Sequence, residues 1–454
     1  MKRLLTLGPS LLLLLVAVSL LRAWTLGDAG QSLQPGILGD LPRAIPPGVA
    51  TAALALGLLL LGSFLLGEIL SLIGLPRVSG ALLFGLLVGP QLHQWLSLPF
   101  PPLVEHAELR YLELIDALAV SLIGLVAGGE IRLQFLRRSM GVVLRLVATE
   151  AVGVVLWVGV GVSILGQWIP LLSERTSVER WFLTLVLAVM AVANSPAIVT
   201  AMLRETGANG IFARTALAVT VVKDLSLVIL VSALLAAWSA TASGGASIAL
   251  EVAWHLSGSL LVGGVFAGLL GLAVFKTRGR LDLVVLVASF AIALAGRMLS
   301  IAPLLAGITA GFALANLAPL RSKRLFRSID DLLPATYALF FAVAGARIGV
   351  DALSSLWPVV LALSTLRIAG IYSGLRIGCR WARVQPPMQR WIWTSMVPQA
   401  GVSIALISEV GKAFAGQPWV NQLLALLLSS VALHEIVGPP LLRLGLLRCD
   451  EVKR

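Results

Sequence analysis

The stretch Ala193-Asn-Ser-Pro196 interrupts an apolar segment at residues 181–203, and the stretch Met396-Val-Pro-Gln399 interrupts another at residues 390–412. Each segment has about the 20 mostly apolar residues that a membrane-spanning helix needs. Proline lacks an amide donor and clashes with the preceding turn, so each helix is expected to break near its middle. In lipid, backbone groups freed in this way are tolerated only where they line a cavity or meet polar partners. The two stretches therefore predict two discontinuous membrane helices around a polar centre.

The composition excludes a water-soluble protein. Of the 454 residues, 58% are hydrophobic and 12% are charged, whereas ordinary soluble domains carry about a quarter charged residues. Disordered, collagen-like and disulfide-rich classes are excluded as well, because the chain is apolar, has no triplet repeat and holds two cysteines. The net charge of +12 is interpreted as Lys and Arg in cytoplasmic loops, with no nucleic-acid partner. We therefore predict an all-α polytopic membrane protein in the lipid bilayer.

About 13–14 transmembrane helices are expected. Thirteen apolar stretches lie near residues 49–74, 78–97, 111–131, 140–168, 181–203, 211–238, 247–274, 281–298, 300–319, 332–352, 356–379, 390–412 and 419–443. A fourteenth stretch, Leu4–Leu21, is interpreted as a retained extra span, with a signal peptide as the alternative.

Three regions follow from this map. Residues 1–48 hold the N-terminal hydrophobic segment and an external linker, residues 49–445 form the transmembrane domain, and residues 446–454 form a short cytoplasmic tail. When successive loops alternate sides, most of the 34 Lys and Arg residues fall in cytoplasmic loops and tails, as membrane proteins prefer. This predicts a multi-pass protein of the cell (inner) membrane with a cytoplasmic C-terminus.

Related segments recur about seven spans apart. Val126–Arg132 at the end of the third span resembles Val343–Gly349 at the end of the tenth, and Ala81–Gly89 in the second resembles Leu304–Gly311 in the ninth. Because seven is odd, the two copies face opposite ways across the bilayer. This is the inverted-repeat plan of secondary transporters, which place their binding site where the repeats meet.

Lys223-Asp224 lies mid-way along the sixth span, three residues after Thr220. A charge at the bilayer centre is costly, so each one needs a partner or a function. We predict Asp224 as the shared ion and proton ligand, with Lys223 and Thr220 beside it. The alternative is a mutually neutralised pair that locks helices together.

Other candidates surround this pair. Asn194 and Ser195 supply polar groups at the first break, whose helix breaker is Pro196, and Pro398 with Gln399 forms the second break. Three further groups complete the set. Arg347 is predicted as a buried cation partner, and Glu150, Arg297 and Glu409 are predicted to serve access or pairing. The four histidines and two cysteines form no metal motif, so no metal and no cofactor are expected.

The order of these motifs resembles the monovalent cation/proton antiporters, the sodium/proton and potassium/proton exchangers of bacteria. The resemblance covers about residues 49–445. It rests on Gly74–Pro90, Leu122–Ile131, Asn194-Ser-Pro-Ala197, Ser300–Asn316, Phe340–Gly345 and Val397–Val402.

The resemblance implies a core domain with two crossed discontinuous helices and a scaffold domain that forms a homodimer. The core would move like an elevator and exchange a monovalent cation for protons. Asp224 occupies the acidic position of the family's sixth-helix motif, and Arg347 sits where members often carry a Lys or Arg. Lys223 departs from the usual Asp, Asn or Gln.

The resulting hypothesis is exchange of Na⁺ or K⁺ for H⁺ at Asp224, electroneutral if the Lys223 charge is fixed. Two alternatives stay open on the same scaffold, a sodium-coupled organic-anion symporter and a non-transporting membrane sensor. An enzyme is not expected, because no nucleophile–base pair or nucleotide-binding loop stands out.

Overall fold

The computed structural model describes residues 10, 13–15, 47–73, 75–97, 102–131, 133–173, 175–241, 245–276, 280–348, 350–399, 403–404, 406–407, 410–411, 414 and 416–452. Within these ranges the regular structure is helical and no strand is present, which confirms the all-α prediction. The chain divides into two compact units. The first unit is formed by Met1–Ala119 and Leu332–Val350, and the second by Val120–Asp331 and Asp351–Arg454.

The first unit is built on a close contact between two helices that are far apart in the sequence. It contains α3 (Pro47–Leu72), α4 (Arg77–Val88), α5 (Pro90–Trp95), α6 (His106–Tyr111), the start of α7 (Glu113–Glu130) and α17 (Leu333–Ala346). A Cβ atom at Gly85 of α4 would fall on the Ala342 carbonyl, and one at Gly345 of α17 would fall on the Leu82 carbonyl. Glycine at both positions lets the two backbones touch, as at many membrane helix contacts.

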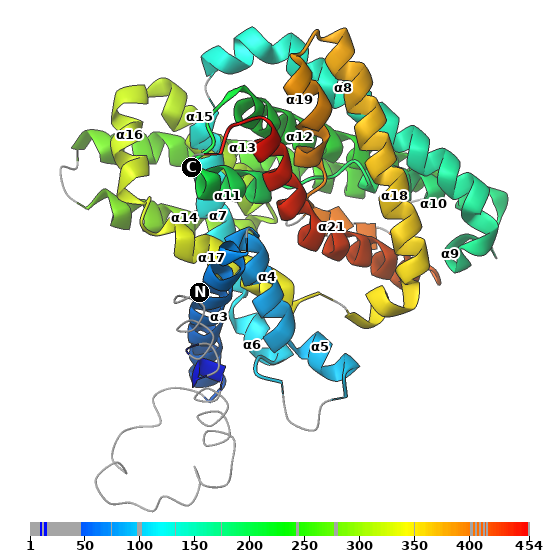
Figure 1. The fold of residues 1–454 in the computed structure, drawn as a ribbon, viewed down its shortest axis with the longest axis horizontal. Coiled ribbons are helices and arrows are strands. Elements are labelled where there is room, and N and C mark those ends of the chain that lie inside the picture. Colours follow the sequence, from blue (N-terminus) through cyan, green and yellow to red (C-terminus); the bar gives the residue numbers. More distant parts are fainter. Residues whose placement is uncertain are drawn as a thin grey trace, which may run out of the picture. The chain divides into compact units, whose positions relative to one another are not determined.

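The second unit holds the remaining helices, of which Figure 1 labels the α-helices. They are α8 (Leu133–Leu165), η1 (Gly166–Trp168), α9 (Pro170–Ser173), α10 (Ser177–Met190), α11 (Pro196–Thr206), α12 (Ile211–Thr241), α13 (Gly245–Lys276), α14 (Leu281–Leu299), α15 (Pro303–Leu317), α16 (Pro319–Ser328), α18 (Val350–Trp381), α19 (Pro386–Trp391), η2 (Ile392–Met396) and α21 (Val420–Arg448).

Small residues also bring helices of the second unit together. A Cβ atom at Gly128 of α7 would meet the Ile308 carbonyl of α15, and one at Gly311 of α15 would meet the Leu125 carbonyl of α7. The long helices α8 and α18 approach in the same way, because a Cβ atom at Gly153 would lie 2.6 Å from the Gly370 carbonyl oxygen. Glycine thus lets these pairs of helices pack closely within the second unit.

Several helices have the length and the apolar composition of membrane-spanning helices. Among the described residues, six helices are long and apolar enough to cross a membrane, namely α3, α8, α13, α14, α18 and α21. Each of the spans expected between residues 49 and 443 contains helix. The expected first span, Leu4–Leu21, falls almost entirely outside the described residues.

Candidate functional site

The first predicted break is present at the expected residues. Helix α10 ends at Met190, residues 191–195 are non-helical, and α11 begins at Pro196. The Ser195 hydroxyl accepts a hydrogen bond from the Ile198 amide at 3.2 Å and so caps the new helix. Proline is favourable at the first helical position, where its missing amide donor is not needed. The Ser-Pro sequence therefore starts α11, and Ser195 acts as its cap.

The second break follows η2. Val397, Pro398 and Gln399 are non-helical there. Residues 400–402 lie outside the described part of the chain. Pro398 packs against α21, since a Cβ atom at Gly438 would lie 2.6 Å from the Pro398 Cα. Both breaks therefore occur at the prolines that predicted them.

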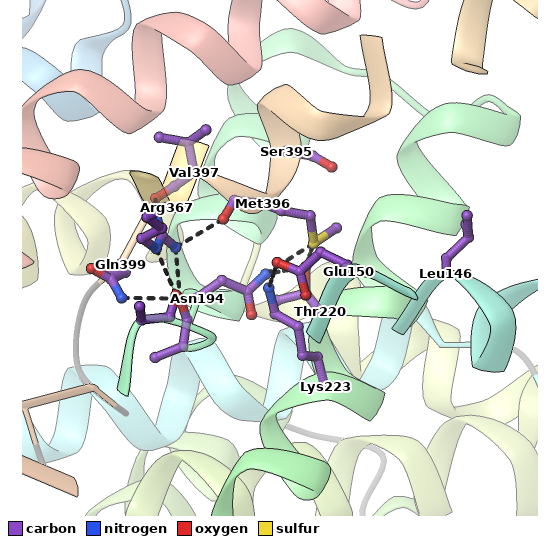
Figure 2. A network of polar contacts seen from close by, with 12 residues as sticks. Leu146, Glu150, Asn194, Thr220, Lys223, Arg367, Ser395, Met396, Val397 and Gln399 are labelled. Carbon is purple, nitrogen blue, oxygen red and sulfur yellow. Dashed lines mark hydrogen bonds and ion pairs between the residues drawn. The ribbon is translucent and has the colours of Figure 1, made fainter. Parts of the chain in front are cut away.

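Arg367 of α18 joins the two breaks (Figure 2). Its guanidinium donates to the carbonyls of Ala191 at 2.8 Å and Ala193 at 2.7 Å in the first break. It also donates to the carbonyls of Met396 at 3.0 Å and Val397 at 2.8 Å in the second. These carbonyls lie at the ends of α10 and η2, where helix dipoles are negative. A buried cation, 2% exposed, is thereby hydrogen-bonded to backbone carbonyls of both breaks.

Side chains of the breaks complete this contact. The Gln399 amide donates to the Ala193 carbonyl at 3.1 Å. The Asn194 amide donates to the Thr220 hydroxyl of α12 at 3.0 Å and to the Met396 sulfur at 3.3 Å. The two broken segments and α12 therefore meet at one point inside the second unit, as Figure 2 shows.

Lys223 forms an ion pair with Glu150 of α8. The Lys223 Nζ atom lies 2.9 Å from the Glu150 Oε1 atom, and the two side chains are 1% and 0% exposed. The sequence had placed Glu150 among candidates for access or pairing, and the structure makes it the partner of Lys223. Lys223 therefore has a direct partner on α8 in addition to its sequence neighbour Asp224.

Asp224 is buried without a hydrogen-bond partner. Neither of its carboxylate oxygens accepts a hydrogen bond within the described residues, although its side chain is 7% exposed. Asp224 follows Thr220 by four residues, so the two share one face of α12. The contact of Asn194 with Thr220 thus places the first break next to the Asp224 turn. The Asn194 Oδ1 atom is also without a partner in this region.

The contacts described above involve neither Arg347 nor Arg297. Arg347 was expected to be buried, but it is exposed at the end of α17 in the first unit. Helix α17 ends at this position, and the long side chain extends to the Leu109 carbonyl of α6, to which it donates at 3.4 Å. Arg297 is exposed in the last turn of α14. Glu409 lies outside the described residues.

A small, mostly apolar cavity, about 30 Å³ in volume, lies next to Arg367. It is lined by Arg367, Gln399, Ser364, Ser403 and His434, among apolar residues. This volume suits one or two water molecules. The described residues contain no group of three or more His, Cys, Asp or Glu side chains that would hold a metal ion.

Comparison with known proteins identifies the family of this chain. The model of the transmembrane sodium/hydrogen exchanger family matches residues 55–444. No curated protein sequence matches the chain.

Solved structures agree with this fold. The sodium proton antiporter MjNhaP1 from Methanocaldococcus jannaschii, solved at pH 8, is 17% identical with a TM-score of 0.64, covering 90% of this chain and 100% of that one. An electron-microscopy structure of the same antiporter is 17% identical with a TM-score of 0.68, covering 89% of this chain and 99% of that one. The family match, which spans most of the sequence, shows that this multi-pass membrane protein belongs to the transmembrane sodium/hydrogen exchanger family.

Proposed function

We propose that this protein is a secondary active transporter that exchanges a monovalent cation, Na⁺ or K⁺, for H⁺ by alternating access, with Asp224 as the shared ligand. The observation that carries the proposal is the state of Asp224. It is a buried carboxylate that accepts no hydrogen bond within the described residues and lies on the α12 turn beside the first break. A buried charge of this kind is costly unless a counter-ion or a proton neutralises it.

The groups near Asp224 suit a hard cation. The Asn194 amide oxygen has no partner in the described structure, and the Thr220 hydroxyl lies one turn before Asp224. Oxygen atoms of carboxylates, amides and backbone carbonyls are the ligands that such cations prefer. A bound cation and a bound proton would therefore compete for the same carboxylate, and this competition couples their movements.

The ion pair of Lys223 and Glu150 supports electroneutral exchange. Its two charges cancel at 2.9 Å inside the protein, so the pair needs no further ion. Asp224 then contributes a single negative charge, which one proton or one monovalent cation neutralises. One-for-one exchange follows. The role of Lys223 differs from our expectation from the sequence, in which Lys223 itself offset the Asp224 charge.

We further propose inverted repeats, elevator movement of a core against a dimeric scaffold, and a cytoplasmic C-terminus in the cell membrane. The reciprocal glycine contacts support the repeats, because α4 meets α17 and α7 meets α15. These pairs join the second expected span to the tenth and the third to the ninth. The proposed repeat operation exchanges one pair for the other.

The organic-anion symporter is disfavoured by the buried cations. Such a substrate needs a free positive group in the site, and the buried Lys and Arg side chains among the described residues are Lys223 and Arg367. Lys223 is bound to Glu150, and Arg367 is bound to four carbonyls.

Vesicles reconstituted with purified protein test the function. An inward pH gradient is set up, and Na⁺, K⁺ and Li⁺ are added in turn while a pH dye reports proton movement. Wild type should dissipate the gradient with at least one cation, and Asp224→Asn should abolish the response. Asp331→Asn, an exposed Asp, is the matched control and should leave the response unchanged. Exchange in the Asp224→Asn variant, or exchange driven by membrane potential alone, would overturn the proposal.

A further inference from the structure

Helix α12, which carries Thr220, Lys223 and Asp224, begins without a cap of its own. The residue before it is Gly210, whose carbonyl accepts from the Arg214 amide at 3.2 Å. Helices usually begin at Ser, Thr, Asp or Asn, whose side chains accept from the first free amides. Gly210 has no side chain to do so. The first amides of α12 therefore need an acceptor from elsewhere in the chain.

Glu451, which follows α21, supplies that acceptor. Its Oε1 atom accepts from the Phe212 amide at 2.7 Å, and its Oε2 atom accepts from the Ala213 amide at 2.9 Å. One carboxylate thus satisfies two amides and places a negative charge at the positive end of the helix. The sequence separation exceeds 230 residues, so this is a tertiary contact rather than a local cap.

The glycine before α12 fits this arrangement. A Cβ atom at Gly210 would fall on the Glu451 carboxylate. Because Gly210 has no side chain, the Glu451 carboxylate can occupy the position where the side chain of a capping residue would lie. Residues 210 and 451 act as one capping unit.

The same end of α21 also contacts the second break. A Cβ atom at Gly445 would meet the Thr394 hydroxyl of η2 and would lie 3.1 Å from the Phe212 ring of α12. The Arg448 guanidinium lies 5.5 Å from the centre of the Trp391 ring of α19. Residues 445–451 therefore touch both the start of α12 and the helices that lead into Val397–Gln399.

The geometry points to Glu451 as a positioning residue for the transport site. By fixing the start of α12 to the end of α21, Glu451 holds Thr220 and Asp224 in register with Met396 and the second break. This inference rests on the proposed function, because its consequence is the affinity for the cation. Glu451 itself is far along the chain from the site and touches neither ion.

Three variants separate positioning from simple helix capping. Glu451→Ala removes the acceptor and the tie to α21. The double variant Gly210→Ser with Glu451→Ala gives α12 a local cap without restoring the tie. Asp450→Asn removes the neighbouring negative charge and serves as the control. All three are made in the full-length chain.

In vesicles, Glu451→Ala should raise the KM for the cation roughly fivefold, the factor expected for the loss of one hydrogen-bonded contact between α12 and α21, and leave kcat within about twofold. The double variant should keep the raised KM, and Asp450→Asn should match wild type. A wild-type KM in Glu451→Ala, or recovery of KM in the double variant, would overturn the inference.

Hydrogen–deuterium exchange gives a reading that does not depend on transport. Glu451→Ala should speed exchange both at residues 211–215 and at residues 394–399. The double variant should restore protection at residues 211–215 only. If wild-type vesicles move no cation, the proposed function fails, while exchange at residues 394–399 still decides whether Glu451 holds the second break. Unchanged exchange at residues 394–399 would contradict the positioning role.

Discussion

The broken helices bring together two buried charges that the protein treats in opposite ways. On one side, Arg367 donates to four backbone carbonyls within 3.0 Å. On the other, Asp224 accepts no hydrogen bond within the described residues. A buried charged group whose hydrogen-bonding atoms all have partners contributes to the structure. A buried charged group without such partners is a candidate for binding a ligand. The difference suits Arg367 to holding the two breaks together and supports the proposed ion exchange at Asp224.

The ion pair of Lys223 and Glu150 belongs with the Arg367 side. Although Lys223 precedes Asp224 in the sequence, successive residues of a helix point about 100° apart. The two side chains therefore point in different directions, and that of Lys223 reaches Glu150 of α8. Removing a single partner on the structural side should lower stability, whereas Asp224 variants should lose transport without losing stability.

The largest effect is expected at Arg367. Arg367→Gln removes charge-assisted hydrogen bonds worth roughly 1.5–3 kcal/mol each and leaves carbonyls of both breaks without donors. We expect a loss of about 5 kcal/mol or more, seen as a large fall in the melting temperature in detergent, with no transport. Arg380→Gln, at an exposed position of the same helix, is the control.

Asp224→Asn completes this test, because it removes an unsatisfied buried charge. Its melting temperature should equal or exceed that of wild type. The comparison breaks down if Arg367→Gln melts like wild type, or if Asp224→Asn is as unstable as the arginine variant.

The second prediction concerns the ion pair. Glu150→Leu or Lys223→Met alone leaves an uncompensated buried charge and should cost about 3–5 kcal/mol. The double variant should cost less than either single variant, because it removes both charges together. Thermal unfolding of the four proteins measures this coupling.

Transport by the double variant decides whether the pair is a spectator. Electroneutral exchange should persist, because Asp224 still binds one cation or one proton. A double variant that folds but does not transport, or that becomes electrogenic, would place Lys223 in the ion cycle and overturn its assignment to the structural side.

Much of this arrangement could be read from the sequence because it depends on local backbone chemistry. Pro196 and Pro398 lack an amide donor and clash with the preceding turn, which favours a break at each position. The charge of Asp224 in the middle of an apolar span marks a functional group. The family resemblance was confirmed over residues 55–444.

The partners of the buried charges could not be read in this way. Several acidic residues lie inside expected spans, and nothing in the sequence selects Glu150 for Lys223. Arg367 binds backbone carbonyls, which carry no sequence signal. The sequence did contain one indication about Arg367. The span 356–379, which contains Arg367 near its centre, has no acidic residue, so this arginine needs acceptors from other parts of the chain. Arg347 was wrongly expected to be buried because a position near a helix end does not show whether a long side chain faces inward.

The smallest effect tests the comparison at the protein surface, where a carboxylate does have donors. Glu179, at the exposed start of α10 and before the expected span 181–203, accepts hydrogen bonds from the Thr176 hydroxyl at 2.9 Å and the Thr176 amide at 3.1 Å. The Thr176 hydroxyl is the main reason that the pKa of Glu179 lies below its usual 4.5.

Because the folded state favours the ionised form of Glu179, its contribution to stability is complete above pH 4.5 and is lost as the pH falls below it. The melting temperatures of wild type and Thr176→Val should therefore differ by a constant amount above pH 5 and converge on acidification, by an amount on the order of 1 °C. A difference that stays constant down to pH 3 would mean that the donors do not favour the charged carboxylate, and would remove hydrogen bonding as the property that separates Glu179 from Asp224.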